Sequence, residues 1–530
     1  RTHNDDGHQQ VGGMKGGSRD LLRRRARASA RAGQATRAHS QALMRLLSLS
    51  EWLPVIRVLG LLLCVVALMM LAPLLVLLGE ADADASAFLI SLGITLGSAV
   101  IMLTVSRKVE LQLKPRAMFV LTTLSWVLVS AYSSLPLIFG ATHLGVTDAV
   151  FESVSAITTT GSTVLSDIEG LSDGLKLWRG LMQWVGGIGI IVMAIAILPF
   201  LKVGGMRLFQ TESSDWSDKV LPRAGGVAKA IGLVYVGLTL LAIVCYWLGG
   251  MHWLDALVHG MTSLATGGFS NYDSSMGVYS DRPYLLWMAS AFMLLGALPF
   301  VLFIRAWQDQ AGVLWRDAQV RGFLRLLGWV IALLTLYRVV NGEAIFTALT
   351  QVTFNVISVV TTTGYASDDY SAWGSFAVVA FFYLTFVGGC SGSTSGGMKI
   401  FRLQIGLIML GNHLRSLIHA NGVFSQRYNG RALPDEVVRA VIAFSFFFFI
   451  TIGGLALALS FIGLDLITAV TGAATAVTNV GPGLGEIIGP AGNFSSLPDS
   501  AKWLLCIGML MGRLEILTVL VLFSPSFWRK

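Results

Sequence analysis

Cysteine and charge are both scarce in this chain. Its 530 residues include only four cysteines, which are scattered along the sequence as Cys64, Cys245, Cys390 and Cys506. Their spacing matches neither a metal-binding motif nor a disulfide framework. Charged residues make up 13% of the chain, against about 25% in soluble domains, whereas 54% are hydrophobic and the mean hydropathy is +0.69. The composition excludes an ordinary soluble protein and predicts an all-α polytopic membrane protein.

A recognisable set of catalytic residues is also lacking. No nucleophile, general base or metal-ligand cluster recurs at a plausible spacing, so the sequence does not predict an enzyme. The glycine-rich stretch 388–399 could be mistaken for a phosphate-binding loop, but it lacks the Gly-Lys-Ser/Thr ending and lies in an apolar segment. We therefore expect no nucleotide site and no cofactor within this chain.

What the sequence does contain is many long apolar segments. A helix needs about 20 mostly apolar residues to cross the hydrocarbon core of a bilayer. Ten segments fit this length and are predicted to span at 52–79, 86–106, 117–140, 178–200, 228–249, 285–304, 323–340, 374–411, 436–462 and 501–524. Four shorter segments are predicted to form re-entrant helices at 147–158, 253–265, 344–360 and 466–478.

Charge is distributed unequally between the two ends of these segments. Basic residues gather in the connections near 107–116, 202–229, 305–325 and 399–439, whereas the alternate connections are acidic. Because Lys and Arg in short loops mark the cytoplasmic side, both termini are predicted to be cytoplasmic. Residues 1–50 hold ten Lys or Arg and three Asp, a net charge of +7. We interpret the run Arg23–Arg27 as a topology anchor, in preference to a site for anionic lipid or nucleic acid.

A short motif that ends on glycine follows each of the four short segments. The copies are Thr158-Thr159-Thr160-Gly161, Leu264-Ala265-Thr266-Gly267, Thr361-Thr362-Thr363-Gly364 and Thr478-Asn479-Val480-Gly481. Their glycines lie 106, 97 and 117 residues apart, which predicts four copies of one unit. Because glycine adopts positive φ without steric penalty, four such strands can form a ring of carbonyl oxygens that replaces the hydration shell of an ion. The motif therefore predicts a cation pore.

The predicted fold is an N-terminal helical hairpin plus four parallel span–re-entrant helix–span repeats around a central pore. Its predicted units are a basic N-terminal segment at 1–50, a transmembrane hairpin at 51–110, and pore repeats at 111–205, 206–312, 313–425 and 426–530. Each re-entrant helix would direct the negative end of its dipole at the axis, which favours a cation there.

Acidic residues lie near the predicted starts of three re-entrant helices. Asp148, Asp255 and Asp465 precede the motif glycines by 13, 12 and 16 residues, and Gln351 takes the equivalent place in the third repeat. Acidic residues are frequent at helix N-termini, where they accept hydrogen bonds from backbone N–H groups. We therefore interpret the three carboxylates as helix caps rather than ion ligands.

Three longer motifs accompany the glycine loops. They are Gln183-Trp184-Val185-Gly186-Gly187-Ile188-Gly189, the stretch from Gly388 to Lys399, and Gly512-Arg513-Leu514-Glu515. Together with the loops they resemble the TrkH/TrkG/KtrB superfamily of potassium transporters over residues 51–530, and the extra hairpin resembles the TrkH branch. The resemblance implies inward potassium transport across the bacterial inner membrane, a homodimer with one pore in each subunit, and a cytosolic TrkA-type ring that binds nucleotides and controls opening.

The predicted potassium filter contains three residues from each motif. They are Thr159, Thr160, Gly161, Ala265, Thr266, Gly267, Thr362, Thr363, Gly364, Asn479, Val480 and Gly481. In some relatives serine replaces the first glycine and sodium is carried, so four glycines favour potassium as the transported ion. A sodium-coupled or less selective cation transporter, and a secondary transporter of an organic solute, are the alternatives. Within the re-entrant helices, Glu152 is expected to hydrogen-bond behind the filter and His259 to be a packing residue.

A gate is predicted beneath this filter, where the Gly, Ser and Thr residues of 388–397 are expected to break the helix of the third repeat. Arg513 lies within a predicted span, where a charge costs about 2.5–3.5 kcal/mol at the helix centre, and the matching arginine of the family projects into the pore. The predicted gate comprises Arg513, Gly388, Gly389, Ser391, Gly392, Ser393, Thr394, Gly396 and Gly397. The alternatives are an Arg513–Glu515 pair or a purely structural bond from Arg513 to loop carbonyls.

Overall fold

The computed structural model describes residues 49–78, 83–108, 113–196, 224–308, 312–419, 422 and 424–529. The predicted basic segment, including Arg23–Arg27, therefore lies outside the described residues except for positions 49 and 50. Helices dominate the described part of the chain, whose named strands are a short antiparallel pair, β1 (Arg427–Tyr428) and β2 (Arg431–Ala432). The all-helical class predicted from composition is confirmed.

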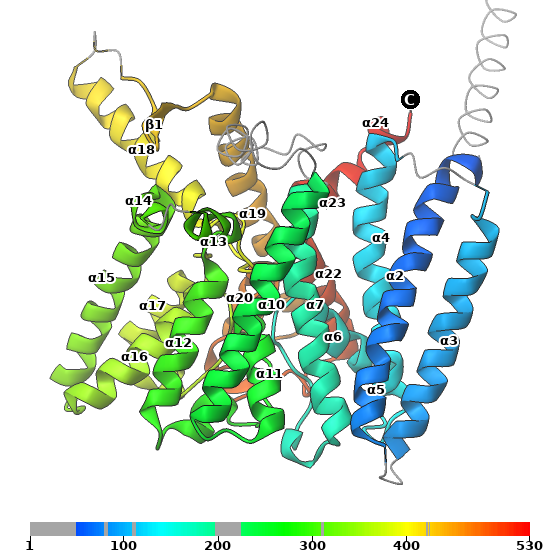
Figure 1. Ribbon diagram of the computed structural model, residues 1–530. Coiled ribbons are helices and arrows are strands. Elements are labelled where there is room, and N and C mark those ends of the chain that lie inside the picture. The colour runs from blue at the N-terminus through cyan, green and yellow to red at the C-terminus, as the bar shows by residue number, and fades with distance from the viewer. Residues whose placement is uncertain are drawn as a thin grey trace, which may run out of the picture.

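An N-terminal group of helices stands beside the rest of the molecule (Figure 1). It contains α2 (Leu49–Val76) and α3 (Ala83–Val105), followed by α4 (Pro115–Ser133) and α5 (Leu135–Phe139). Met70 and Phe88 are buried between these helices, and Phe88 packs edge-on against Trp178. On the outer faces, Leu68 and Ile101 remain 66% and 65% exposed. Such apolar surface is expected where the solvent is lipid.

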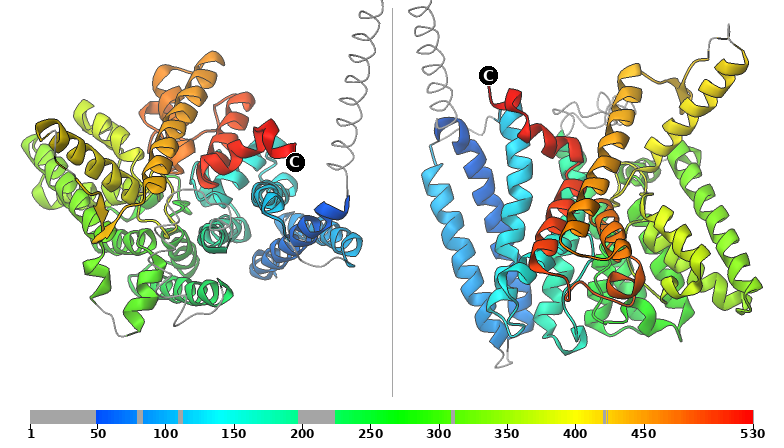
Figure 2. Two further views of the ribbon diagram at one scale, coloured as in Figure 1. Left: turned by 90° about the horizontal axis from the view of Figure 1, so that it is seen from above. Right: turned by 180° about the vertical axis from the view of Figure 1, so that it is seen from behind.

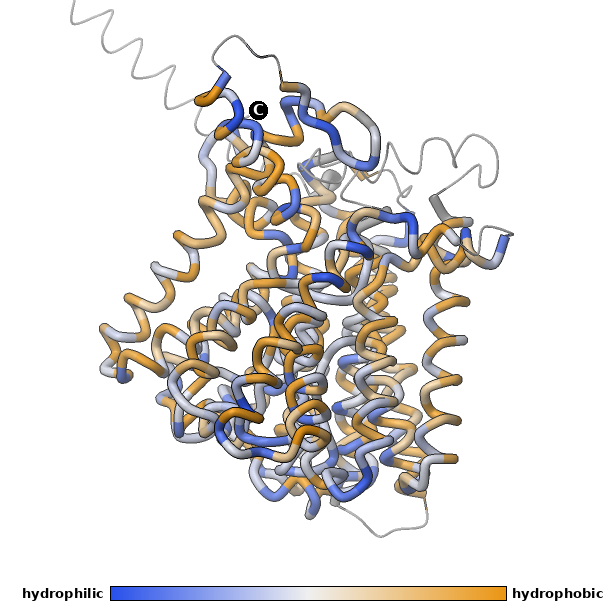
Figure 3. The backbone as a smooth tube through the Cα atoms, turned by 90° about the vertical axis from the view of Figure 1, so that its left-hand side faces the viewer, coloured by the Kyte–Doolittle hydropathy of each residue, from blue (hydrophilic) through white to orange (hydrophobic). Residues whose placement is uncertain are grey.

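Six helices within the described residues are long and apolar enough to cross a membrane, and two bent helix pairs raise the number to eight. Besides α2, α3 and the α4–α5 pair, they include α10 (Ala224–Leu248), α15 (Ala318–Val340) and α19 (Asp435–Phe461). Figure 3 shows hydrophobic colour along the helices and hydrophilic colour gathered toward both ends of the molecule. The two other predicted spans correspond to α7 (Asp173–Ala196) and to a broken segment described below.

Two spans predicted to be continuous are sharply bent, which corrects the sequence prediction. Helix α12 (Pro283–Ala297) meets α13 (Phe300–Trp307) at 93°, because Pro299 between them lacks the N–H that would continue the helix. Helix α22 (Asp499–Arg513) meets the segment of α23 (Ile516–Leu520) and η4 (Val521–Phe523) at 110°. At that break Glu515 has a left-handed φ of 61°.

The predicted span 374–411 is broken into two helices. Helix α17 (Ser375–Thr385) and helix α18 (Ile400–Ile418) are separated by the segment 386–399, which we call the subfilter loop. Five of the 14 residues of this loop are glycines, and Gly392 and Gly397 adopt positive φ. The prediction that Gly, Ser and Thr interrupt this span is confirmed.

Four short helices carry the glycine motifs. They are α6 (Val146–Ile157), α11 (Trp253–Leu264), α16 (Ile345–Val360) and α20 (Leu466–Thr478), each boundary within one residue of the predicted range. The smaller elements are η1 (Ile168–Gly170), η2 (Ser275–Tyr279), α14 (Val313–Arg316), η3 (Tyr370–Trp373), α21 (Gly485–Ile488) and α24 (Pro525–Trp528). Seen from above, the helices that follow the hairpin surround a common centre (Figure 2). The boundaries assigned to the four repeats stay a prediction.

Candidate functional site

The loops that follow the four short helices, which we call the filter loops after their predicted role, share one backbone pattern. A left-handed residue comes first, and a glycine with positive φ follows two positions later. The first members are Thr159, Thr266, Thr362 and Asn479, with φ of 53°, 50°, 57° and 57°. The glycines are Gly161, Gly268, Gly364 and Gly481, with φ of 87°, 80°, 84° and 111°. Left-handed threonine is uncommon because its branched Cβ crowds the backbone, and such strain concentrates at functional sites.

This pattern corrects the predicted register of the second loop by one residue. Gly267, which we predicted as the counterpart of Gly161, does not have positive φ, whereas Gly268 does. Ala265 is the C-cap of α11 and is therefore the counterpart of Thr158, the C-cap of α6. The second strand thus consists of Thr266, Gly267 and Gly268. Two adjacent glycines left the register open, because the motif does not show which of them must be left-handed.

The four loops close into a ring through contacts between glycines and carbonyl groups. A Cβ placed on Gly161 would lie 2.3 Å from the carbonyl oxygen of Gly267, and one on Gly268 would lie 1.9 Å from that of Thr363. A Cβ on Gly364 would lie 1.9 Å from the oxygen of Val480. The ring closes where a Cβ on Gly481 would lie 2.6 Å from the oxygen of Thr160. Each glycine therefore abuts the loop of the next repeat.

Side chains reinforce this ring. The Thr158 and Thr160 hydroxyls are 2.7 Å apart in the first loop, and those of Thr361 and Thr363 are 2.8 Å apart in the third. Across the join of the fourth and first loops, Ser162 Oγ donates to the Gly481 carbonyl at 2.8 Å. At the same join Asn479 Nδ2 donates to Thr160 Oγ1 at 2.9 Å. The loops are thus tied to one another as well as to their own helices.

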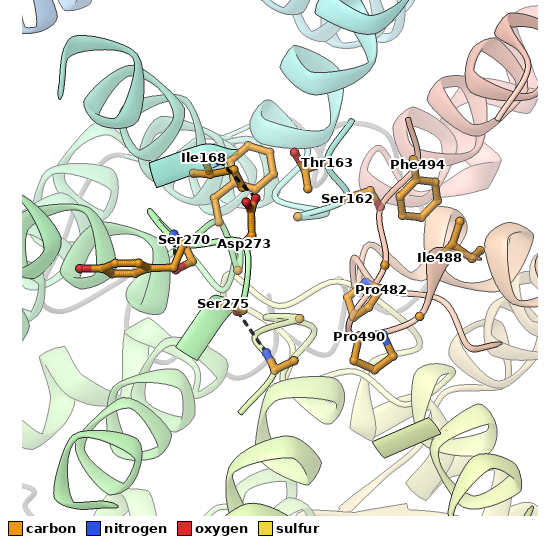
Figure 4. Close-up of a pocket in the computed structure, with 18 of the residues that line it drawn as sticks. Ser162, Thr163, Ile168, Ser270, Asp273, Ser275, Pro482, Ile488, Pro490 and Phe494 are labelled. Carbon is orange, nitrogen blue, oxygen red and sulfur yellow. Dashed lines mark hydrogen bonds between the residues drawn. The ribbon is translucent and has the colours of Figure 1, made fainter. Parts of the chain in front are cut away.

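An open pocket with an empty volume of about 520 Å³ lies over the ring. Its lining includes Gly161, Gly268 and Gly364, together with Pro482, which follows the fourth glycine. Asp273 also lines the pocket, and Figure 4 shows its carboxylate beside Ile168. The Asp273 oxygens accept hydrogen bonds from the backbone N–H groups of Asp167 and Ile168 at 2.9 and 3.2 Å. An acidic group at a mouth raises the local concentration of cations.

The side chain nine residues before each glycine braces the loop from behind in three of the repeats. Glu152 accepts hydrogen bonds from Thr163 Oγ1 and Val164 N, each at 3.0 Å. His259 Nε2 lies 3.0 Å from Ser270 Oγ, in hydrogen-bond contact. The expectation for Glu152 is confirmed. His259 is a packing residue as expected, fully buried against the Tyr272, Tyr279 and Tyr365 rings, but it also contacts the loop. The shifted register concealed this second role, because it concealed the equivalence of His259 to Glu152.

The third and fourth repeats use neutral groups for the same purpose. Asn355 Nδ2 donates to Ser367 Oγ at 2.9 Å, and its Oδ1 accepts from Ser367 N at 3.2 Å. Gly472 takes this position in the fourth repeat, where the neighbouring Thr471 Oγ1 accepts from Leu484 N at 3.1 Å. The four braces therefore differ in chemistry while they support loops of similar shape.

The three acidic residues predicted as caps behave differently from one another. Asp465 is the cap of α20 and accepts from Thr468 N at 3.0 Å, and its hydrogen bonds with Thr468 hold the pKa of Asp465 below its usual value. Asp148 instead pairs with Lys502 Nζ at 2.6 Å. Asp255 accepts hydrogen bonds from Asn271 Nδ2 at 2.8 Å and from the Tyr272 hydroxyl at 2.7 Å. The prediction of caps is correct for Asp465 and wrong for the other two, because tertiary partners reach their carboxylates.

Arg513 is buried and bonds to backbone carbonyl groups. Its Nη1 donates to the Thr394 carbonyl of the subfilter loop at 2.8 Å, and its Nη2 donates to the Gly186 carbonyl at 3.3 Å. Glu515 pairs with Arg402 at 2.7 Å. The structure therefore contradicts the alternative of an Arg513–Glu515 pair. Bonding of Arg513 to a loop carbonyl is confirmed, and its predicted role in gating stays a prediction.

The central part of the subfilter loop contacts the filter loops directly. Thr394 Oγ1 donates to the Leu264 carbonyl at 3.0 Å, and Ser395 Oγ donates to the Thr361 carbonyl at 2.8 Å. The N–H of Gly396 donates to Thr362 Oγ1 at 2.6 Å. The second and third filter loops therefore rest on this segment. Ser395 was not among the predicted gate residues.

The other predicted gate residues make their contacts within the loop or with neighbouring helices. The N–H of Gly388 donates to Met398 O at 2.8 Å. The N–H of Gly389 donates to Ser395 Oγ at 2.9 Å. The N–H of Ser391 donates to Gln319 Oε1 at 2.9 Å. The Gly392 carbonyl accepts from Phe300 N at 3.0 Å, Ser393 Oγ donates to Cys390 O at 2.6 Å, and Gly397 packs on Thr362 and Gly388. Ser391, Gly392 and Ser393 thus contact Gln319, Phe300 and Cys390 rather than a filter loop.

Sequence reasoning also missed the role of Gln183 in α7. Its Nε2 donates to the Gly267 carbonyl at 2.6 Å, and its Oε1 accepts from Phe269 N at 3.0 Å. One amide thus holds the second filter strand from both sides of Gly268. The signal was a polar residue inside a predicted span, where polar groups need a reason to be present.

Comparison with known proteins gives concordant matches. The sequence model of the family TrkH, described as cation transport protein, matches residues 87–530. The Trk system potassium uptake protein TrkI of Halomonas elongata is 66% identical over 483 residues, which cover 91% of this chain and 98% of that protein. The Trk system potassium uptake protein TrkH of Escherichia coli (strain K12) is 36% identical over 482 residues, covering 89% and 99%. The crystal structure of the potassium transporter TrkH from Vibrio parahaemolyticus matches with a TM-score of 0.83 at 34% identity, covering 90% of this chain and 99% of that one.

Proposed function

Because the chain belongs to the TrkH family of cation transport proteins, we propose that it takes up potassium through the ring of four glycine loops. Relatives that match almost throughout their length are named potassium uptake proteins. A potassium ion must lose its hydration shell to pass a narrow pore, and ordered carbonyl oxygens compensate for that loss. The function is therefore membrane transport rather than catalysis.

The observation that carries this proposal is the closed sequence of contacts around the ring. Four carbonyl groups, those of Thr160, Gly267, Thr363 and Val480, each abut the glycine of a neighbouring loop. The loops follow the C-termini of α6, α11, α16 and α20, whose negative dipole ends favour a cation. In the register corrected here, the filter comprises Thr159–Gly161, Thr266–Gly268, Thr362–Gly364 and Asn479–Gly481.

We infer that Arg513 and the subfilter loop form the gate. The guanidinium holds the loop by the Thr394 carbonyl, while the same loop supports the second and third filter strands. A fixed positive charge below a cation filter opposes conduction. Movement of the loop would free Arg513 and change the path beneath the filter at the same time.

We also infer the setting in which this protein works. The family resemblance supports a homodimer in the bacterial inner membrane and a cytosolic TrkA-type ring that controls opening in response to nucleotides. The positive-inside pattern supports cytoplasmic termini. The C-terminus lies at the same end of the molecule as the start of α4, where the basic connection 107–116 ends (Figure 1). Potassium is the transported ion.

Rubidium uptake into liposomes that contain the purified protein tests the function. We expect unlabelled potassium to block this uptake at concentrations where sodium does not. Equal block by sodium would contradict a potassium filter and favour a less selective cation transporter. Absence of flux, both alone and with the TrkA-type ring of a relative added with its nucleotide, would contradict a cation pore.

A further inference from the structure

A fully buried ion pair lies beside the filter. Arg179 Nε and Glu152 Oε1 are 2.9 Å apart, and their side chains are 1% and 0% exposed. Burying two charges carries a desolvation penalty that can exceed the gain from their attraction. A neutral brace such as that of Asn355 supports the third loop without this penalty. The pair therefore needs an explanation beyond stability.

Arg179 contacts the first and second filter loops at corresponding positions. Its Nη1 donates to the carbonyl of Ser270, two residues after Gly268, at 3.0 Å. Its Nη2 lies 3.4 Å from Oγ1 of Thr163, two residues after Gly161. The guanidinium also lies over the Phe269 ring, 4.1 Å from its centroid. One rigid, planar group thus spans the outer ends of two neighbouring loops.

Glu152 completes this cross-link from the other side. Its oxygens accept from Thr163 Oγ1 and from Val164 N, each at 3.0 Å. The carboxylate thereby joins α6 to its own loop, while Arg179 joins α7 to the loop of the next repeat. Two other pairs of neighbouring loops are connected by hydrogen bonds between neutral groups. These run from Ser162 Oγ to Gly481 O at 2.8 Å and from Ala366 N to Ser275 Oγ at 3.2 Å.

We propose that the Glu152–Arg179 pair is a positioning element that fixes the spacing of the first two filter strands and so sets discrimination between potassium and sodium. This inference rests on the proposed filter. Hydrogen bonds between ionised groups are shorter and stronger than neutral ones. The connection between the first and second filter loops is therefore the one that moves least when a smaller ion enters the filter. Functional geometry of this kind must be held to within about 0.5 Å.

The test measures the sodium concentration that halves rubidium uptake into liposomes. Arg179→Gln removes the charge, whereas Arg179→Lys keeps the charge but loses the planar group that bridges Ser270 and Thr163. In both variants we expect sodium to inhibit at a concentration lower by about tenfold, the change that about 1.4 kcal/mol produces. Glu152→Gln, which changes the charge with little change in volume, should act in the same direction.

Lys176→Gln is the matched control. Lys176 lies three residues before Arg179 on α7, pairs with Asp173 at 3.8 Å, and donates to the Glu169 carbonyl at 2.8 Å. The Lys176→Gln substitution therefore removes one positive charge near the mouth without changing a contact to a filter loop. We expect this variant to discriminate between potassium and sodium as the wild type does. If Lys176→Gln changed the discrimination between potassium and sodium as much as Arg179→Gln, and Arg179→Lys left it unchanged, loss of positive charge near the mouth would be the cause and the proposal would be overturned.

Failure of this inference is distinguishable from failure of the proposed function. A wild-type protein that does not discriminate against sodium overturns the filter itself. A selective wild type with an equally selective Arg179→Lys or Glu152→Gln variant overturns the positioning role alone. If Arg179→Gln is not monodisperse after purification, these two milder variants decide the outcome.

Discussion

The first and third repeats build nearly the same loop on different supports. Both loops read Thr-Thr-Thr-Gly. Their left-handed threonines have φ of 53° and 57°, and their glycines have φ of 87° and 84°. The same hydroxyl contact, at 2.7 and 2.8 Å, links the first and third threonines of each loop. We infer that the local sequence, rather than the support, specifies the shape of these two loops.

The supports behind and beneath the two loops differ. The first is braced by the buried Glu152–Arg179 pair, and the helix that follows it, α7, runs unbroken from Asp173 to Ala196. The third is braced by Asn355, and the segment that follows it breaks into α17, the subfilter loop and α18. We infer that the first repeat provides a fixed side of the filter, whereas the third provides a movable one.

The largest expected effect tests what the two repeats share. Gly161→Ala and Gly364→Ala each place a Cβ 2.3 or 1.9 Å from a carbonyl oxygen of the next loop. A left-handed alanine also carries about 1–2 kcal/mol of backbone strain. We expect both variants to lose nearly all rubidium uptake into liposomes. Gly411→Ala in α18 is the control, because nothing lies within 4 Å of its Cβ position. Wild-type uptake by either filter variant would contradict a ring in which every glycine is required.

The second-largest expected effect tests whether Arg513 holds the subfilter loop, the support beneath the third loop, in a closed position. Arg513→Ala removes bonds to the Thr394 carbonyl of the third repeat and the Gly186 carbonyl of the first. Hydrogen bonds from charged donors contribute about 1.5–3 kcal/mol each, so we expect rubidium flux without an activating partner to rise by roughly tenfold.

Arg513→Lys is the graded control for this prediction. It retains the positive charge but cannot reach two carbonyl groups with a planar fork, so an intermediate flux is expected. Unchanged or reduced flux in a well-folded Arg513→Ala protein would show that Arg513 only holds the structure together.

The sequence predicts the features that depend on local interactions better than those that depend on interactions between distant segments. The spans, the short helices and three of the four filter glycines depend on local composition and periodicity, and they are found in the structure close to their predicted places. The second glycine is one residue from its predicted place because Gly267 and Gly268 are adjacent, and only the folded structure distinguishes them. There Gly268 has positive φ and abuts the Thr363 carbonyl.

Interactions between distant segments account for the remaining errors. Arg179 and Ser270 are 91 residues apart, and Arg402 and Glu515 are 113 apart, so no local pattern reveals either contact. The bend at Pro299 has a local signal, a proline within an apolar segment, but span length alone predicts a continuous helix there. The bend at Glu515 had none, because its φ of 61° is imposed on a residue that ordinarily avoids it.

A smaller effect tests whether the third loop rests on the subfilter loop. Ser395→Ala removes hydrogen bonds to the Thr361 carbonyl and from Gly389 N, and the contact of its hydroxyl with Thr362 Oγ1 at 3.1 Å. We expect rubidium flux without an activating partner to rise by roughly two- to fivefold, since neutral hydrogen bonds contribute about 0.5–1.5 kcal/mol each. Ser393→Ala is the matched control, because the Ser393 hydroxyl bonds to Cys390 O inside the same loop. Equal effects of the two variants would show that the loop supports no filter strand.

The smallest expected effect tests whether the hydroxyl contact within the loop contributes equally to the first and third loops, although their supports differ. Thr158→Val and Thr361→Val replace a hydroxyl by a methyl group of similar size and remove the 2.7 and 2.8 Å contacts to the following threonines. Each should lower the free energy of unfolding by about 1 kcal/mol, the usual contribution of one hydrogen bond. Thermal unfolding in detergent measures this loss. Equal losses, with rubidium flux unchanged in both, are expected if local sequence alone specifies the loop. A rise in flux confined to Thr361→Val would show instead that the movable support extends into the filter strand, because the Thr361 carbonyl also accepts the bond from Ser395.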